Sequence, residues 1–443
     1  MSRARGEDTR VVTQPDAVPG SRERAWLVAA GAIALVATVA RVHNAFAFTP
    51  LRDFDGPGHA LNVFAFYQGQ MPDPLSWSGF HPPLYYALSA TLWHALPDSV
   101  PVHVALRLLS ASAGFGAIAI AYCALRRFVP AADAAVVAAF VLCAPVMAIA
   151  MSMLGNETIC ALFATAALAR LCAIPNEPAR ALSHAWPTAL LAALAALSKS
   201  TGLGVVPVVA LAYFGACRRN RRTGMRAVLL CVGLPALLVA PHYGRLALAS
   251  GSLRAVIGGG APSDAAGSEM AAQPPGERHL SDYLLVPSAT FFAPFVEAPE
   301  MVRSVPGLLY ATTWADAHGQ FLPATARGVV TAAALCSLFG LVPTALMVAG
   351  AIRIARNRRA YATAFGPMLF ATLLVVALLV QTWVVPRYSA VKASYLLPAL
   401  LPFALALAVG VSSTRGVLRG FVRVFLLLFS AFATVVTWYG WWT

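Results

Sequence analysis

Long apolar runs recur along the chain from residue 25 almost to its end. Many of them exceed the roughly 18 residues that a helix needs to cross a bilayer core about 30 Å thick. A helix on the surface of a soluble protein would show a polar face at every turn, and these runs do not alternate as barrel strands would. The pattern therefore predicts an all-α polytopic membrane protein.

The apolar runs predict about 11 transmembrane helices. They lie near residues 25–46, 104–125, 132–152, 157–174, 185–199, 200–217, 227–243, 328–351, 362–385, 394–412 and 421–440. The fifth and sixth runs are short and would also fit one broken pair. Residues 1–24 are polar and contain proline and glycine, so we expect a disordered cytoplasmic tail. Residues 25–443 are expected to form a single transmembrane domain.

Composition strengthens this interpretation, because 59% of the residues are hydrophobic and only 11% are charged, against roughly 25% charged in soluble proteins. The formal net charge of +14 could indicate nucleic-acid binding in a soluble protein. Here the arginines form short clusters between apolar runs. The positive charge is therefore expected to set membrane topology, and a nucleic-acid partner is not expected.

The arginine clusters predict which side of the membrane each loop occupies. If the N-terminus is cytoplasmic, every inner turn carries arginine, as at residues 126–127, 218–226 and 353–359, in accordance with the positive-inside rule. The opposite side then holds two long loops, 47–103 and 244–327. Long ordered loops on a rigid scaffold often carry function. We expect these loops to be periplasmic, in a bacterial inner membrane.

The first outer loop begins with the sequence LRDFDGPGH at residues 51–59. A carboxylate of Asp53 or Asp55 could take a proton from an acceptor hydroxyl. The Asp-x-Asp spacing also suits a divalent cation, which oxygen ligands bind; no other cofactor is suggested. Acidic residues are equally common where a solvated loop begins, so the spacing leaves all three interpretations open.

Further along this loop, the sequence HPPLYY occupies residues 81–86. Its two prolines favour an extended entry, and its aromatic residues begin an amphipathic stretch suited to a helix at the membrane interface. A simple turn at the membrane surface is the alternative. His59 and His81 could bind a substrate or a metal, although a single loop histidine more often does neither.

Three cations lie at the outer ends of predicted spans. Lys199 interrupts a long apolar run, where a lysine is costly and usually marks function, although its side chain could also extend to the interface. Arg387 and Lys392 occupy a short outer loop and could simply anchor the helices. Glu157 begins a span, where the helix dipole favours a carboxylate.

The order of these motifs resembles the GT-C glycosyltransferases, in the branch of protein O-mannosyltransferases and bacterial aminoarabinose and lipopolysaccharide-core sugar transferases. The acidic start of the first outer loop precedes HPPLYY in both. The resemblance continues through NE at 156–157, AALSKSTGL at 195–203, TWADAHG at 313–319 and YLLPALLP at 395–402. It extends from about residue 25 to residue 412.

The resemblance implies transfer of a hexosyl or pentosyl group from a polyprenyl-phosphate donor to an acceptor hydroxyl on the periplasmic face. Asp55 matches the family's general base best, but the family's usual Asp-Glu pair is Asp55-Gly56 here. The choice between Asp55 and Asp53 therefore stays open. Lys199, Arg387 and Lys392 correspond to cations that hold the donor phosphate.

The resemblance also suggests residues that contact the substrates, namely His59, His81, Tyr85, Glu157, Asp316, His318 and Tyr395. The expected partners are the membrane, a polyprenyl-phosphate sugar, and a lipid, glycan or protein acceptor. The sequence does not distinguish among these acceptors or identify the sugar.

Two other function classes share much of this pattern. A multi-pass transporter or lipid flippase would have the same hydrophobicity, topology and intramembrane lysine. Transporters often contain inverted repeats and charges near the membrane midplane, whereas this sequence shows no repeat and its polar clusters lie at the outer surface. A non-catalytic assembly factor is the third class, and the two aspartates of the first loop argue against it.

Overall fold

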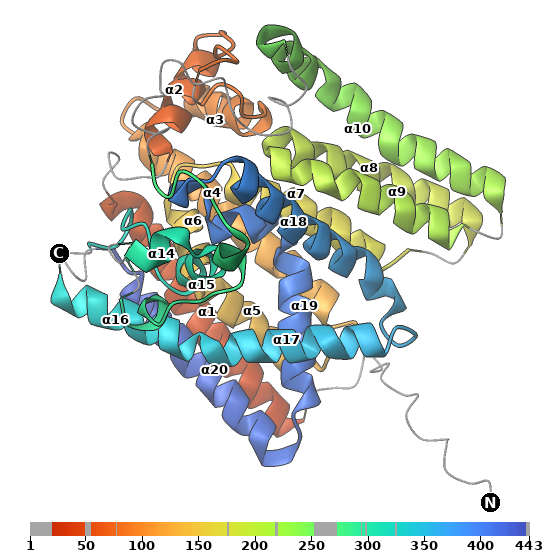
Figure 1. Ribbon diagram of the computed structural model, residues 1–443. Coiled ribbons are helices and arrows are strands. Elements are labelled where there is room, and N and C mark those ends of the chain that lie inside the picture. Colours follow the sequence, from red (N-terminus) through yellow and green to blue (C-terminus); the bar gives the residue numbers. More distant parts are fainter. Residues whose placement is uncertain are drawn as a thin grey trace, which may run out of the picture.

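The computed structural model describes residues 20–48, 55–76, 78–174, 177–217, 220–251, 273–293, 295–296, 299–323 and 326–439. The regular elements of these residues are helices, arranged as one bundle with the short helices α2 and α3 at one edge (Figure 1). In addition to the helices, an isolated antiparallel β-bridge joins Pro275 and Arg387. The predicted all-α architecture is confirmed.

The first half of the chain forms α1 (Ser21–Ala47), α2 (Gly56–Tyr67), α3 (Leu84–Ala95), α4 (Val102–Leu125), α5 (Ala131–Cys143), α6 (Pro145–Ser152), α7 (Glu157–Leu171), α8 (Pro178–Ser198), the 3₁₀ helix η1 (Ser200–Gly204), α9 (Val205–Ala216) and α10 (Arg221–Ser250). The second half forms η2 (Leu280–Tyr283), α13 (Ala289–Phe292), α14 (Pro299–Arg303), α15 (Val305–Trp314), α16 (Arg327–Phe339), α17 (Leu341–Arg356), η3 (Ala362–Ala364), α18 (Phe365–Val384), η4 (Tyr388–Ala390), η5 (Ala393–Ala399), α19 (Leu400–Ser413) and α20 (Gly416–Val436).

Within the described residues, 8 helical segments are long and apolar enough to cross a membrane. A ninth is added if α5 and α6, which meet at an angle of 56°, form one broken span. Pro145 explains the break, because it lacks an N–H group and forces the preceding residue into an extended conformation. The chain is a polytopic membrane protein.

The length and composition of the described helices support 8 or 9 spans and do not establish the predicted number of 11. The two remaining predicted spans correspond to α7, which has 15 residues, and to the segment Ser200–Ala216, which is shorter than the candidate spans. The structure also differs from the predicted second outer loop, because α10 continues beyond residue 244 to Ser250. Gly251 then ends the helix in the left-handed conformation with φ of 63°.

Helices α17 and α19 approach each other closely through two glycines. A Cβ atom on Gly350 would lie 1.8 Å from the carbonyl oxygen of Ala406, and one on Gly410 would lie 2.0 Å from that of Leu346. Small residues permit such backbone contact between membrane helices, where van der Waals packing replaces the hydrophobic effect. These glycines therefore set the distance between the two helices.

A buried ion pair joins α5 to α20 near the beginning of each helix. The Oδ1 atom of Asp133 lies 2.7 Å from Nε of Arg423 and accepts a hydrogen bond from it, and the carboxylate is fully buried. The guanidinium of Arg423 also lies 5.4 Å from the centre of the Trp26 ring on α1. These contacts hold three helices together at the end where the arginine-rich turns lie.

A second polar network fixes the other end of α1, from which the first predicted outer loop departs. Arg41 donates hydrogen bonds to the carbonyl oxygen and the hydroxyl of Thr437, at 3.0 and 2.8 Å. Asn44 donates to the same carbonyl and to the hydroxyl of Ser152 at the end of α6. The network therefore places α1, α6 and α20 together, immediately before the segment that leads to α7.

The contact between α17 and α19 gives a prediction for stability. Gly350→Ala should lower the free energy of unfolding by about 1–3 kcal/mol, because the added methyl group meets backbone that cannot rotate away. Thermal unfolding of the purified protein in detergent measures this change.

Gly233→Ala is the matched control, because Gly233 lies in the middle of α10 with no atom within 4 Å of an added Cβ. It should leave the melting temperature unchanged or raise it, since alanine is the better helix former. Equal melting temperatures for the two variants would contradict the close contact.

Candidate active site

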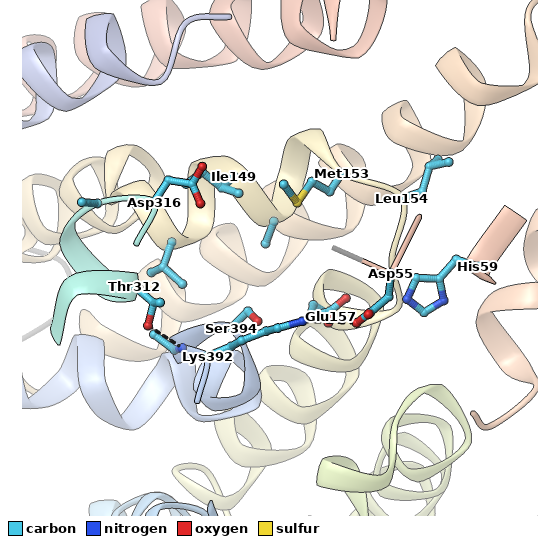
Figure 2. Close-up of a pocket in the computed structure, with 14 residues that line it drawn as sticks. Asp55, His59, Ile149, Met153, Leu154, Glu157, Thr312, Asp316, Lys392 and Ser394 are labelled. Atoms are coloured by element: carbon cyan, nitrogen blue, oxygen red, sulfur yellow. Dashed lines mark hydrogen bonds and ion pairs between the residues drawn. The ribbon is translucent and has the colours of Figure 1, made fainter. Parts of the chain in front are cut away.

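Several polar groups singled out in the sequence meet around a small cavity of about 50 Å³ (Figure 2). Its apolar wall comes mainly from α6 and the turn that follows, through Ile149, Met153 and their neighbours. Its polar lining consists of Asp55, His59, Glu157, Thr312, Asp316, Lys392 and Ser394. The lining residues come from α2, α7, α15 and the region around η5, which are far apart in the sequence.

Asp55 immediately precedes α2 and directs its carboxylate into the cavity. Gly56 and Pro57 favour a helix start here, and the carbonyl of Asp55 accepts the first hydrogen bond, from the His59 amide at 2.9 Å. Its side chain makes no capping hydrogen bond to the helix. The carboxylate instead lies 3.4 Å from the ammonium of Lys392, so the two form an ion pair.

The charges around Asp55 determine its protonation. Burial alone would raise the pKa of this carboxyl group, but the charge of Lys392 lowers it, with a smaller contribution from Lys199. The cations outweigh burial, and the pKa of Asp55 lies well below its usual range. Asp55 is therefore a carboxylate at neutral pH and can accept a proton.

A second ion pair lies beside the first. Glu157 is the first residue of α7, and its Oε1 atom lies 2.5 Å from Nζ of Lys199. Gly155 leaves room for this carboxylate, because a Cβ there would lie 2.4 Å from Oε2 of Glu157. Lys199 is mostly buried and does not itself line the cavity.

The backbone around Lys199 explains why its side chain leaves α8. Lys199 follows the last residue of α8 and has extended dihedral angles. Its carbonyl accepts a hydrogen bond from the Gly202 amide at 2.9 Å. A Cβ on Gly202 would lie 2.2 Å from the Ala195 carbonyl oxygen, so the tight turn requires glycine.

Tyr395 lies near both lysines. The Lys199 ammonium is 4.7 Å from the centre of its ring and the Lys392 ammonium 5.9 Å, distances at which the ring attracts a cation. The structure therefore brings Lys199 and Lys392 together around one aromatic ring. Their role in phosphate binding stays a prediction.

His59, His81, Tyr85 and Tyr86 form an aromatic group on the side of Asp55 formed by α2 and α3. Nδ1 of His59 and the Tyr86 hydroxyl are 2.8 Å apart, and the His59 ring lies 5.2 Å from that of His81. The ring of Tyr85 meets that of His59 edge-on at 5.9 Å. This group supports the start of α2, where Asp55 is located.

Burial keeps these rings neutral. It lowers the pKa of His59, and together with nearby His59 and Lys199 it lowers the pKa of His81 to about 3. It raises the pKa of the Tyr86 hydroxyl well above its ordinary value. Asp55 therefore has neutral hydrogen-bonding neighbours on this side at physiological pH.

Asp316 lines the cavity but also organises its own loop. Its Oδ2 atom accepts hydrogen bonds from the amides of Phe321 and Leu322 at 2.6 and 2.8 Å. His318 does not line the cavity; its Nε2 atom lies 3.2 Å from the Val391 carbonyl oxygen. Burial, assisted by the charge of Lys392, lowers the pKa of His318 to about 4.

The structure does not place Arg387 with the other two predicted phosphate-binding cations. Arg387 is half-buried and does not line the cavity. Its carbonyl oxygen accepts a hydrogen bond from Arg278 at 3.3 Å. Asp53 lies outside the described residues, so its position relative to Asp55 stays a prediction.

Three residues near the cavity were not singled out from the sequence. Thr312 accepts a hydrogen bond from the Ala393 amide at 3.0 Å and so joins α15 to η5 (Figure 2). Ser394 lines the cavity, and Tyr86 contacts His59. Each lies within or beside a recognised motif, but nothing in the pattern separates it from its neighbours.

Among the described residues, no group of three or more His, Cys, Asp or Glu side chains is arranged to hold a metal ion. The divalent cation suggested at Asp53 and Asp55 involves a residue outside these ranges. A cation at that pair therefore stays a prediction.

The buried histidines give a prediction for pH dependence. His318 has an ordinary pKa of 6.5 that falls to about 4 in the folded protein. Between these values the unfolded chain binds a proton that the folded chain does not, so stability decreases as the pH falls through this window. Each pH unit removes up to about 1.4 kcal/mol.

His318→Gln should therefore reduce the loss of melting temperature between pH 6.5 and 4. The control is His94→Gln on the exposed end of α3, which should leave the pH dependence as in the wild type. The same pH dependence in all three proteins would show that His318 does not remain neutral in the folded state.

Comparison with known proteins relates the fold of this chain to solved structures. No family model and no curated protein sequence matches the chain. Solved structures do match. One is ArnT from Cupriavidus metallidurans bound to undecaprenyl phosphate, with 14% identity, a TM-score of 0.50, and 88% of this chain and 61% of that chain covered.

The oligosaccharyltransferase of Archaeoglobus fulgidus in its apo form also matches, with 15% identity, a TM-score of 0.53, and coverage of 94% of this chain and 56% of that chain. A further match is the archaeal oligosaccharyltransferase AglB, also from Archaeoglobus fulgidus, in complex with an inhibitory peptide and a dolichol-phosphate. It has 14% identity and a TM-score of 0.53, and the match covers 94% of this chain and 55% of that chain.

The identities are low, and this chain spans 55% to 61% of the length of these three proteins. The similarity extends over 88% to 94% of the present chain. The chain therefore has the fold of the GT-C membrane glycosyltransferases.

Proposed function

We propose that this protein is an inverting glycosyltransferase that moves a sugar from a polyprenyl-phosphate donor to an acceptor hydroxyl. The observation that carries the proposal is the pairing of Asp55 with Lys392, beside the pair of Glu157 and Lys199, at one cavity. The GT-C fold supports it, as do the polyprenyl phosphates present in two of the similar structures.

Asp55 is the general base in this proposal. It takes the proton of the acceptor hydroxyl while the acceptor oxygen forms a bond to the anomeric carbon of the sugar. The bond from that carbon to the phosphate oxygen breaks, and its electrons leave with the polyprenyl phosphate. Asp53 remains the alternative base, and the pair could also share a divalent cation.

Lys199 and Lys392 hold the phosphate as negative charge develops on it. Lys392 lies closer to Asp55 and lines the cavity, so it is the first of the two that an entering phosphate meets. Lys199 is fixed behind it by Glu157 and by the ring of Tyr395. Arg387 would assist at the entrance rather than inside the cavity.

Donor binding would also activate the base. In the structure Lys392 stabilises the charged form of Asp55 and so makes it a weak base. A phosphate that attracts Lys392 away from Asp55 removes this stabilisation, and the pKa of Asp55 then rises towards the range useful for proton transfer. The cavity of about 50 Å³ is smaller than a sugar, so donor entry must also separate the elements around it.

The proposed topology follows the arginine distribution. The chain crosses the membrane 11 times if α7 and Ser200–Ala216 each form a short span in addition to the candidates. The N-terminal tail, residues 1–24, is cytoplasmic, and residues 25–443 form one transmembrane glycosyltransferase domain. The loops 47–103 and 244–327 are periplasmic in a bacterial inner membrane. Asp55, His59 and His81 in the first loop, and Asp316 and His318 in the second, then lie on the periplasmic side, where the acceptor would arrive.

The remaining predicted contacts divide by position. His59, Glu157 and Asp316 line the cavity and would contact the sugar or the acceptor directly. Tyr85 and His81 support His59 from behind, and Tyr395 supports the two lysines.

Replacement of Asp55 tests the mechanism. Asp55→Asn keeps the shape of the side chain and removes its charge, so turnover of a polyprenyl-phosphate sugar should fall by about 10²–10⁴. Donor binding should stay equal or become tighter, because Lys392 loses the carboxylate that competes with the phosphate. Single-turnover assays and direct binding of the lipid donor measure the two quantities.

Asp98→Asn is the matched control, because Asp98 is an exposed acid of the same loop and should leave both quantities unchanged. Asp53→Asn distinguishes the two candidate bases. An inactive Asp53→Asn beside a fully active Asp55→Asn would move the base two residues back. Full activity in both would contradict the mechanism and favour a transporter or lipid flippase.

A further inference from the structure

A second cavity, of about 510 Å³ and largely open to the surface of the protein, lies between α4, α7 and α8. Small apolar residues of α4, of α7 and of the turn after α7 form most of its wall, among them Ala119, Ala124, Ala166, Ala169 and Ala173. Three basic side chains line it as well, Arg127, Arg170 and His184. Its size is typical of sites for lipid-sized or drug-sized ligands, which are roughly 300–1,000 Å³.

This cavity lies far from the candidate active site along the same helices. Helix α7 begins at Glu157, beside the active-site cavity, and its last turns line the second cavity. Helix α8 likewise contributes His184 near its beginning and leads to Lys199 just after its end. In the proposed topology, on which the choice of leaflet depends, the second cavity lies at the cytoplasmic side.

Arg170 is held rigidly at this cavity. Its Nε atom donates to the Thr188 hydroxyl at 2.9 Å, and its Nη2 atom donates to the His184 carbonyl oxygen at 3.1 Å. The Thr188 and Tyr213 hydroxyls are 2.9 Å apart, and Tyr213 also contacts Nδ1 of His184 at 2.6 Å. Arg170 is therefore positioned before any ligand arrives.

Arg127 provides a second guanidinium at the same cavity. It follows the end of α4, and its Nη1 atom donates to the Cys172 carbonyl oxygen at 3.2 Å, which uses one of the five N–H groups of an arginine. Within the ranges that the structure describes, no ion pair joins Arg127 or Arg170 to a carboxylate. Two cations that line the same largely apolar cavity favour an anion with a hydrocarbon part.

We propose that this cavity binds an anionic phospholipid of the cytoplasmic leaflet. One acyl chain fills the alanine-lined cavity, and the lipid phosphate lies between Arg127 and Arg170, where guanidinium groups can bind its oxygens in pairs. A free phosphate would leave the apolar wall uncovered, and a neutral lipid would leave the cations without a net negative partner. Basic pockets between helices on the cytoplasmic side bind anionic headgroups by the same chemistry.

Such a lipid would stabilise the helices that carry the active-site ion pair. It bridges α4, α7 and α8 at one end, while Glu157 and Lys199 lie at the other ends of α7 and α8. Binding to the folded state alone raises the apparent stability as the lipid concentration increases. This role does not require glycosyl transfer, so it stands or fails separately from the proposed function.

Titration of the delipidated full-length protein in detergent tests the proposal. Phosphatidylglycerol and phosphatidylcholine with identical acyl chains are compared, and native mass spectrometry and melting temperature report binding. Phosphatidylglycerol should bind more tightly and raise the melting temperature more. Arg127→Gln should weaken its binding about tenfold or more, as expected for loss of a charge-assisted phosphate contact.

Arg126→Gln is the matched control. Arg126 is the neighbouring exposed arginine, lies 5.9 Å from the centre of the Tyr122 ring, and does not line the cavity. It should bind phosphatidylglycerol as the wild type does. Ala169→Phe fills the cavity without changing the charge and should weaken binding of both lipids.

Three results would overturn the proposal. Equal binding of the two lipids by the wild type, or equal losses in Arg126→Gln and Arg127→Gln, would show that the cavity does not select an anionic lipid. An equal rise in melting temperature with the soluble headgroup glycerophosphoglycerol would make it an anion site without a lipid chain. The melting temperature of each variant in phosphatidylcholine shows whether it is folded.

Discussion

Two buried lysines facing two carboxylates are the constraint on which the rest of the site depends. The ammonium groups of Lys199 and Lys392 both lie close to the ring of Tyr395. Like charges this close in a partly buried place repel each other. Asp55 and Glu157 offset that repulsion, each at one lysine. Because breaking a buried pair leaves an uncompensated charge at a cost of several kcal/mol, the four groups must stay together or be joined by another ion.

The four charges come from four separate segments of the chain. The helices of the bundle bring the ends of these segments together. Asp55 precedes α2, Glu157 begins α7, Lys199 follows α8, and Lys392 precedes η5. Local sequence determines the position of these helix ends. Pro57 favours the start of α2. A Cβ atom at Gly155 would collide with the Glu157 carboxylate, and one at Gly202 would collide with the Ala195 carbonyl. The buried Arg41 network places the ends of α1 and α6 beside this group. In the proposed function, an entering phosphate meets Lys392 first, with Lys199 behind it, and Asp55 becomes a stronger base when Lys392 turns to the phosphate.

Much of this arrangement was predictable from the sequence, because intramembrane charges and helix starts are local features. Lys199, Glu157 and Asp55 stand out in an apolar chain, and the GT-C fold agrees with the order of their motifs. The pairing of Lys199 with Glu157 was not predictable, since no local pattern determines which carboxylate a distant lysine meets. The same limit applies to Thr312 and Ser394, which line the cavity only because α15 packs against η5. Arg387 looked equivalent to Lys392 in sequence, yet the hydrogen bond from Arg278 to its carbonyl holds its backbone outside the cavity.

The central property proposed for this site is that it consumes a lipid-linked sugar. To measure this reaction directly, the purified protein in lipid nanodiscs is incubated with a panel of polyprenyl-phosphate sugars that carry the radiolabel in the sugar. Thin-layer chromatography of the lipids then shows which donor loses its sugar. We expect one donor to lose its label and to yield free polyprenyl phosphate. A double variant, Lys199→Met with Lys392→Met, should leave that donor intact. If every donor stays intact with the wild type and instead moves between the leaflets, the protein is a lipid transporter on a glycosyltransferase scaffold and the central claim is wrong.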